Sequence, residues 1–144
     1  ASSDSKDFPE ISSNIVLEDA RPEILRRYFQ EVDSALTPYS GYLVQIADKY
    51  GLDYRLLPAI AIKESGACRI IPPDGHNCWG WGIHSTSSLG FSSYEAAIDA
   101  VSQGLKENYI DQGYVTPEEI MSKYTPLSNG SWAIGVNKVL GEME

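Results

Sequence analysis

Residues 56–68 read "LLPAIAIKESGAC" and form the most hydrophobic segment of the chain, which nevertheless ends in a charged pair, Lys63 and Glu64. The segment is long enough for a short helix, and Gly66 is a residue type that commonly ends one. Glu64 follows Leu57 by seven residues and therefore lies on the same helical face. A glutamate thus shares the face that should point into the core, whereas Lys63 points elsewhere.

This position predicts an unusual carboxyl group at Glu64. Burial disfavours the charged form of a carboxyl, and so does the negative end of the helix dipole, so both raise its pKa. A glutamic acid that keeps its proton near neutral pH can serve as a general acid. The alternative is a structural glutamate just clear of the core, hydrogen-bonded to neighbouring loop amides. Periodicity alone leaves both interpretations open.

Helical periodicity and capping signals surround this segment. The expected helices cover residues 22–36, 38–50, 53–65, 94–109, 117–124 and 131–143. Their expected caps are Thr37, Asp53, Ser92 and Thr116, and Gly51 is expected to end the second helix. Glu95 and Glu119 lie three residues after Ser92 and Thr116, which completes two capping boxes. Residues 67–91 sustain neither period, so we expect loops there with one short hairpin.

The chain therefore reads as a mainly α domain in which a small irregular loop or hairpin insertion lines a cleft. Residues 1–21 are polar and rich in serine, and we expect a flexible N-terminal lead or linker there. Residues 22–144 are the expected folded domain, one of ordinary size.

Composition excludes several kinds of partner. The net charge of the 144-residue chain is −9, whereas binding a nucleic-acid backbone needs clustered Lys and Arg, so we expect no nucleic acid. No apolar run approaches the roughly 18 residues that cross a bilayer, so we expect no stable membrane insertion. We expect a monomer without a cofactor.

The two cysteines, Cys68 and Cys78, allow three interpretations. A disulfide between them would close a short loop and suit an oxidising compartment. His76 and His84 lie close by, so a metal site is the rival, but the spacing fits no common zinc pattern. Free thiols are the third possibility. We favour the disulfide and expect no metal.

Two tryptophans, Trp79 and Trp81, stand between glycines in "NCWGWGI" at residues 77–83. Glycine lets a backbone approach a ligand closely, and exposed indoles suit the apolar faces of sugar rings. The alternative is that one of the two tryptophans belongs to the core. Together with a protonated glutamate, such a wall predicts a carbohydrate cleft.

Four blocks in order resemble the lysozyme-like superfamily: "YGLDYRLLPAIAIKESG", "NCWGWGI", "FSSYEAAIDAV" and "YTPLSNGSWAIGVNKVL". The similarity covers residues 22–144 and is greatest to the bacterial peptidoglycan-cleaving branch, the lytic transglycosylases and the N-acetylglucosaminidases of glycoside hydrolase family 73. The resemblance implies an α+β lysozyme-like fold and peptidoglycan glycan strands as the partner. It also implies a secreted or periplasmic, extracytoplasmic location, to which a removed N-terminal segment could tether the domain.

The resemblance also implies roles for single residues. In the family pattern an "ES" pair ends a helix and its glutamate is the catalytic acid, which corresponds to Glu64 and Ser65. The family's glycine-centred strand corresponds to Trp81, Gly82 and Ile83. A later tyrosine, here Tyr124, lines the site near the reacting sugar.

The predicted catalytic residues are therefore Glu64 and Tyr124. The predicted substrate-binding residues are Ser65, Trp79, Trp81, Gly82 and His84. Alternatives stay open for three of these residues: Ser65 could merely end the helix, Tyr124 could be a core residue, and His84 could be an ordinary loop histidine.

The chain departs from the family pattern in one respect. Many family 73 enzymes resemble glycosidases with two carboxylates, but this chain has no Asp or Glu between Gly75 and Tyr94. A lytic transglycosylase-like mechanism, in which Glu64 serves as acid and then as base, fits better. We therefore predict a peptidoglycan-cleaving glycosidase that acts on β-1,4 bonds between N-acetylated aminosugars. The alternatives are a non-catalytic glycan- or protein-binding domain on the same fold and a helical adaptor with a metal clip.

Overall fold

The computed structural model describes residues 20–82 and 90–143, and the chain is helical in these ranges, with no β-strand. The helices are residues 20–31, the 3-10 helix η1 (Thr37–Tyr39), α2 (Ser40–Tyr50), α3 (Leu56–Ser65), α4 (Tyr94–Asn108), the 3-10 helix η2 (Ile110–Gln112), α5 (Pro117–Tyr124) and α6 (Ser131–Glu142). The prediction of a mainly α domain is confirmed. The predicted hairpin has no strand in the described part of residues 67–91, and residues 83–89 lie outside that part.

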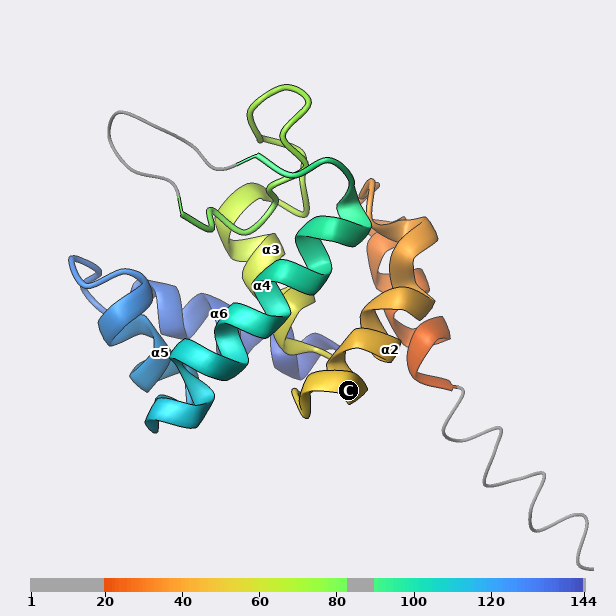
Figure 1. The fold of residues 1–144 in the computed structure, drawn as a ribbon. Coiled ribbons are helices and arrows are strands. Elements are labelled where there is room, and N and C mark those ends of the chain that lie inside the picture. The colour runs from red at the N-terminus through yellow and green to blue at the C-terminus, as the bar shows by residue number, and fades with distance from the viewer. Residues whose placement is uncertain (1–19, 83–89, 144) are drawn as a thin grey trace, which may run out of the picture.

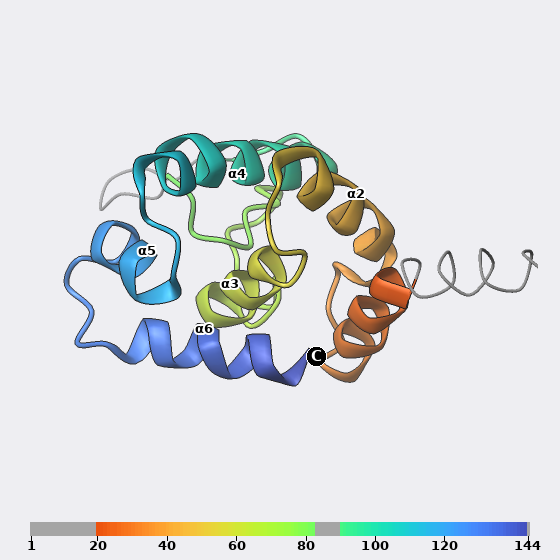
Figure 2. The same cartoon turned by 90° about the horizontal axis from the view of Figure 1, so that it is seen from below.

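The segment at residues 56–65 becomes the central helix of the fold. Figure 2 shows α3 in the middle, with α2 and α4 along one side, α6 along the opposite side and the helix at residues 20–31 at one end. Helix α3 packs against α6, α2 packs against α4, and α5 packs against α6. In the view of Figure 1, α3 lies behind α4, with α5 and α6 on its left and α2 on its right. Glu64 therefore lies at the end of a helix that other helices surround.

Helix α3 is central because it is apolar on nearly every side. Its buried residues are Leu56, Leu57, Pro58, Ala59, Ile60, Ala61 and Ser65. A helix that is hydrophobic all round belongs in a core rather than at a surface. The sequence predicted a single inward face through Leu57, but the structure buries several faces and leaves Glu64 half-buried in the last turn.

Several predicted helix ends are confirmed. Gly51 and Gly66 follow α2 and α3 in the left-handed conformation, with φ of 67° and 60°. Thr116 and Glu119 form the predicted capping box: the Thr116 hydroxyl accepts from the amide of Glu119, and the Glu119 carboxylate accepts from the amide of Thr116. These signals act within a few residues, which is why the sequence predicts them well.

Three predicted caps are wrong. Ser93 caps α4 instead of Ser92, because the Ser93 side chain accepts an amide hydrogen bond from the first turn. Thr37 lies inside η1 and makes no capping contact there. Asp53 accepts from the amide of Arg55 over 2.9 Å, one turn before α3 begins, so that carboxylate shapes the approach to the helix rather than its start.

The first helix spans residues 20–31 and so ends earlier than predicted. Asp33 follows it with a φ of 55°, a left-handed conformation that interrupts a helix. The Ser34 hydroxyl then donates to the carbonyl of Ala67 over 2.9 Å and accepts from the amide of Leu36 over 3.0 Å. This buried serine ties the first helix to the segment that follows Glu64.

Within residues 20–82 and 90–143, no helix has the length and apolar character needed to cross a bilayer.

Candidate functional site

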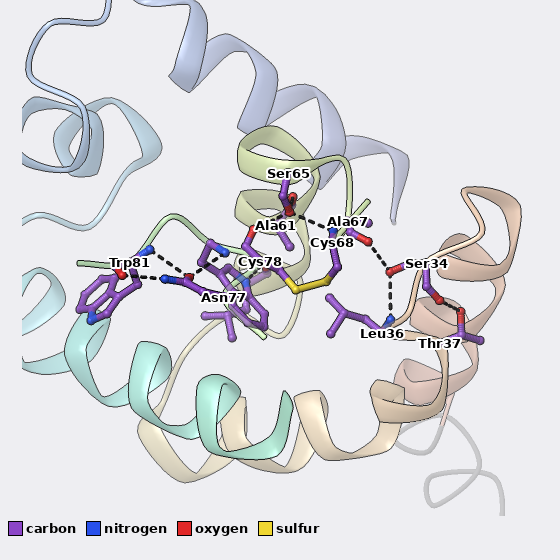
Figure 3. The surroundings of a disulfide bond; sticks show 12 residues. Ser34, Leu36, Thr37, Ala61, Ser65, Ala67, Cys68, Asn77, Cys78 and Trp81 are labelled. Atoms are coloured by element: carbon purple, nitrogen blue, oxygen red, sulfur yellow. Dashed lines mark hydrogen bonds between the residues drawn. A yellow bond between two sulfur atoms is a disulfide. The ribbon is translucent and has the colours of Figure 1, made fainter. Parts of the chain in front are cut away.

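A disulfide joins the end of α3 to the loop that carries the two tryptophans. Cys68 and Cys78 are bonded, with an S–S distance of 2.00 Å and Cα atoms 4.6 Å apart (Figure 3). The predicted disulfide is confirmed. The two thiols that the rival metal site would need are bonded to each other. Among the described residues no group of three or more potential metal ligands is found, and His76 places its Nδ1 atom 2.8 Å from the carbonyl of Phe91. His84 lies outside the described residues.

Ser65 fastens this junction. Its buried hydroxyl lies 2.6 Å from the carbonyl oxygen of Cys78 and 3.1 Å from that of Ala61, and it accepts from the amide of Cys68 over 2.9 Å. Figure 3 shows the hydroxyl between the last turn of α3 and the disulfide. The Ser65 hydroxyl is buried and already bonded to these protein groups. The geometry therefore favours the alternative in which Ser65 ends the helix over a direct contact with substrate.

The backbone just after Glu64 is strained. Gly66 is followed by two further residues in the left-handed region, Ala67 with φ of 60° and Cys68 with φ of 72°. This conformation is uncommon for residues with a side chain, and it persists where the surroundings over-determine it. Ser65, the disulfide and Ser34 supply those restraints. The carboxyl end of α3 is therefore held in one geometry.

Asn77 organises the turn at residues 77–81, a role that was not predicted from the sequence. Its side chain is 2% exposed. The side-chain oxygen accepts from the amide of Trp79 over 3.3 Å. It also accepts from the amide of Trp81 over 3.1 Å, and the side-chain amide donates to the carbonyl of Trp81 over 2.8 Å (Figure 3). An asparagine that precedes a glycine-rich stretch is the available signal, since asparagine side chains often bond to the backbone two residues on.

Trp79 belongs to the core. Its side chain is 0% exposed, and its indole N–H donates to the carbonyl of Leu57 in α3 over 2.9 Å. A sugar platform needs an exposed ring face, so the predicted substrate-binding role is wrong for Trp79. The alternative in which one of the two tryptophans is a core residue is correct.

Trp81 occupies a different environment and is half-buried. Its six-membered ring lies against α4 at Gly104, where an added Cβ would come within 2.2 Å of the ring. Its ring centroid lies 5.9 Å from that of Tyr124 and 6.1 Å from that of Tyr109. The neighbouring Gly82 is exposed and has a φ of 68°. Trp81 and Gly82 therefore stay candidates for contact with a ligand.

Glu64 lies between α6 and the tryptophan loop. The indole N–H of Trp132, in the first turn of α6, donates to Oε2 of Glu64 over 2.5 Å. The other oxygen, Oε1, faces the backbone of Gly80, where a Cβ would lie only 2.8 Å away. Gly80 also has a φ of 63°, which favours glycine. One carboxyl oxygen thus has an indole donor, and the other requires a residue without a side chain.

Burial raises the pKa of Glu64 above its usual value of 4.5, and two groups oppose this rise. The Trp132 hydrogen bond stabilises the carboxylate, and so does the positive charge of Lys63. The net direction is the one predicted from the sequence, and burial, one of the two predicted causes, is the largest influence. A raised pKa favours the protonated form, which is the form that a general acid needs.

Tyr124 connects the tryptophan loop to α6. Its hydroxyl donates to the carbonyl of Trp79, and its ring stacks on that of Trp132, with centroids 5.2 Å apart and an interplanar angle of 29°. Burial and the nearby charge of Glu64 raise the pKa of Tyr124 well above 10, so this tyrosine is neutral. Tyr124 thus packs against Trp81 and lies close enough to Glu64 for the Glu64 charge to act on it.

Sequence reasoning missed Trp132 and Gly80 as parts of the site. Trp132 belongs to the expected last helix, residues 131–143, but its hydrogen-bond partner Glu64 lies 68 residues earlier in the chain. The available signal was chemical: a buried indole N–H needs an acceptor, and Glu64 was the carboxyl group already expected near the core. Gly80 was recognised only as part of a glycine-rich stretch.

Comparison with protein-family models gives no match to this chain, and comparison with curated proteins gives no significant match.

Proposed function

We propose that this protein is a peptidoglycan-cleaving glycosidase with a lysozyme-like fold that acts on β-1,4 bonds between N-acetylated aminosugars. The observation that carries the proposal is the environment of Glu64. Its carboxyl group is half-buried at the end of the central helix, has a raised pKa, and lies between an indole donor and a glycine backbone. A general acid in a glycosidase needs these properties.

The chemistry proceeds through one protein carboxyl group. Glu64 gives its proton to the glycosidic oxygen as the bond from that oxygen to the sugar C1 breaks. The resulting carboxylate then takes the proton of the sugar's own 6-hydroxyl as that oxygen attacks C1, which leaves a 1,6-anhydro product. The Trp132 indole N–H supports the second step, because a hydrogen bond to the charged form stabilises the carboxylate.

The groups that act on Glu64 support a single-carboxyl mechanism. A second carboxylate at the spacing used by retaining glycosidases, about 5 Å, would be a strong influence on the pKa of the first. In the described part of the chain the influences on Glu64 are burial, Trp132 and Lys63, and no other carboxylate is among them.

The remaining aromatic residues take supporting roles in this proposal. Tyr124 holds the loop that carries Gly80 and keeps the ring of Trp132 in place, so it acts as a positioning residue. Trp81 is a candidate platform for a sugar ring, because it is only half-buried and Gly104 and Asn77 fix its position. The disulfide is compatible with work outside the cytoplasm.

The test is digestion of purified peptidoglycan by the wild type, by Glu64→Gln and by Glu31→Gln, with mass spectrometry of the fragments. Glu31 is an exposed glutamate and serves as the matched control. We expect anhydro-muramyl fragments from the wild type and from Glu31→Gln, and none from Glu64→Gln. Reducing ends would instead indicate hydrolysis. Well-folded wild-type protein that binds glycan but releases nothing would overturn the catalytic proposal in favour of a binding domain.

A further inference from the structure

A pocket of about 430 Å³ adjoins the candidate site on the side of α6. Its walls are Lys63 of α3, residues 125–128, and Ser131 and Trp132 at the start of α6. Its volume falls within the range of about 300–1,000 Å³ that is typical of small-molecule sites. Trp132 lines this pocket and also donates its indole N–H to Glu64, so the pocket and the proposed catalytic acid share a wall.

Lys63 brings a positive charge to this wall. Its aliphatic stem crosses α6 at Gly135, where an added Cβ would lie 3.0 Å from Cδ and 3.5 Å from Nζ of the lysine. The absence of a side chain at position 135 therefore lets the lysine lie along α6. Within the described residues the Lys63 ammonium group forms no ion pair and no hydrogen bond, whereas Lys106 and Lys49 each pair with an aspartate.

The rest of the pocket is apolar with a few hydroxyl groups. Pro126 and Leu127 form its apolar part, and Leu127 is 99% exposed. Thr125 lines the same pocket, and its buried hydroxyl oxygen has no hydrogen-bond partner among the described residues. A free ammonium group beside an unsatisfied hydroxyl and an apolar surface suits a small anionic group on a partly apolar ligand.

We infer that Lys63 binds a carboxylate of the substrate directly beside the bond that Glu64 cleaves. This inference rests on the proposed function and names the residue that would distinguish the acidic aminosugar of peptidoglycan from the sugars of a neutral chitin-type chain. The net charge of −9 repels a polyanion at long range. A preference for an acidic glycan over a neutral one therefore has to come from a cation inside the site. The carboxylate belongs either to the lactyl ether of the muramic-type sugar or to its peptide stem.

The test measures binding in a Glu64→Gln background, which prevents turnover. The ligands are three oligosaccharides of matched length, studied by calorimetry. One carries free lactyl carboxylates, one carries peptide stems on those groups, and one is a neutral N-acetylglucosamine oligomer. Lys63→Met removes the charge and keeps the stem, Lys63→Arg keeps the charge, and Lys138→Met removes an exposed lysine of α6 as the matched control.

We expect Lys63→Met to weaken binding of an acidic oligosaccharide by about tenfold, because charge-assisted hydrogen bonds are the strong ones. We expect Lys63→Met to change binding of the neutral oligomer by about twofold or less, because that ligand has no carboxylate to lose. We expect Lys63→Arg and Lys138→Met to change binding of the acidic oligosaccharides by about twofold or less, because both variants keep the charge in the pocket. The source of the carboxylate is whichever acidic ligand responds to Lys63→Met.

Equal weakening of the acidic and neutral ligands by Lys63→Met, or no change in either, would overturn the inference. The proposed function fails separately, when wild-type protein binds the acidic oligosaccharide in a Lys63-dependent way but does not cleave it. A wild type that binds none of the three ligands would overturn both.

Discussion

Trp132 donates its indole N–H to Oε2 of Glu64 over 2.5 Å, and the two residues are 68 positions apart in the chain. This hydrogen bond opposes the effect of burial, because it stabilises the charged form of a carboxyl group whose pKa burial raises. The balance between the two effects sets the pH range in which Glu64 holds its proton.

Replacement of Trp132 by Phe should therefore move the alkaline limb of the pH–rate profile to higher pH. The variant keeps an aromatic ring against Tyr124 but loses the donor, so the pKa of Glu64 rises and the acid form persists further into the alkaline range. A hydrogen bond to a charged group contributes about 1.5–3 kcal/mol, which makes the displacement measurable. The measurement is the rate of peptidoglycan cleavage across pH.

Tyr28→Phe is the control for this experiment. It also removes an aromatic donor from a carboxylate, since the Tyr28 hydroxyl donates to Glu142 over 2.5 Å, but it does so at the other end of α6. Its profile should match that of the wild type. An alkaline limb that does not move in Trp132→Phe, or that moves to lower pH, would contradict the assignment.

Gly80→Ala should remove activity by crowding Glu64. A Cβ at this position would lie 2.8 Å from Oε1, so the carboxyl group or the loop must move. A displacement of about 1 Å at a reacting group can cost about a hundredfold in rate. The left-handed backbone adds a stability cost of roughly 1–2 kcal/mol for a residue with a side chain.

Gly51→Ala separates these two effects. Gly51 has a similar φ, 67°, but no heavy atom lies within 4 Å of the position that an alanine Cβ would take, so the variant carries the backbone cost without the clash. We expect comparable losses of stability in chemical denaturation and a large loss of activity in Gly80→Ala alone. Equal activity in the two variants would mean that the close approach of Gly80 to Glu64 has no catalytic importance.

Glu64→Gln should be more stable than the wild type at neutral pH. A raised folded pKa means that the folded state holds the proton more tightly than the unfolded state, so wild-type stability falls as pH rises from about 4.5 through the folded pKa. Glutamine does not titrate and avoids this loss. The advantage of the variant should therefore grow with pH over that window, measured as the free energy of unfolding in urea.

Glu119→Gln provides a comparison of opposite sign. The backbone amides of Thr116 and Val115 lower the pKa of Glu119, so this carboxylate stabilises the fold above its unfolded pKa and loses that contribution as pH falls. The variant should be less stable than the wild type at neutral pH, by an amount that shrinks in acid. A Glu64→Gln protein that is destabilised in the same way would show that burial does not dominate at Glu64.

Ser65→Ala should lower stability while leaving the KM for peptidoglycan unchanged. The variant strands the amide of Cys68 and removes the donor to the carbonyl of Cys78, and an unsatisfied buried polar group costs about 1–3 kcal/mol. Ser122→Ala is the control, because that hydroxyl donates to a helix carbonyl at an exposed position and its loss should cost about 0.5 kcal/mol or less. A raised KM without a loss of stability would return Ser65 to the substrate-binding residues.

Much of the fold could be read from local patterns. The apolar run of α3, the left-handed glycines after α2 and α3, and the Thr116 capping box involve residues within a few positions of one another, so the sequence contains all the information that forms them. The errors at Ser92, Thr37 and Asp53 each misplace a helix start by a few residues. Sequence patterns locate a helix end only to within one or two residues, and adjacent residues such as Ser92 and Ser93 can both serve as caps.

The candidate site required the packed molecule. From the sequence, Glu64 is a carboxyl group near the end of an apolar helix, and Trp79 and Trp81 are equivalent tryptophans in one glycine-rich loop. Packing makes them different: Trp79 is enclosed against α3, whereas Trp81 lies half-buried against Gly104 of α4. The donor to Glu64 comes from α6, because the central position of α3 brings α6 alongside it. Hydrogen bonds and apolar patterns between near neighbours in the chain determine where the helices form. The burial of Glu64 and its hydrogen bond to Trp132 depend on residues that are distant in the sequence, so only the tertiary structure determines them.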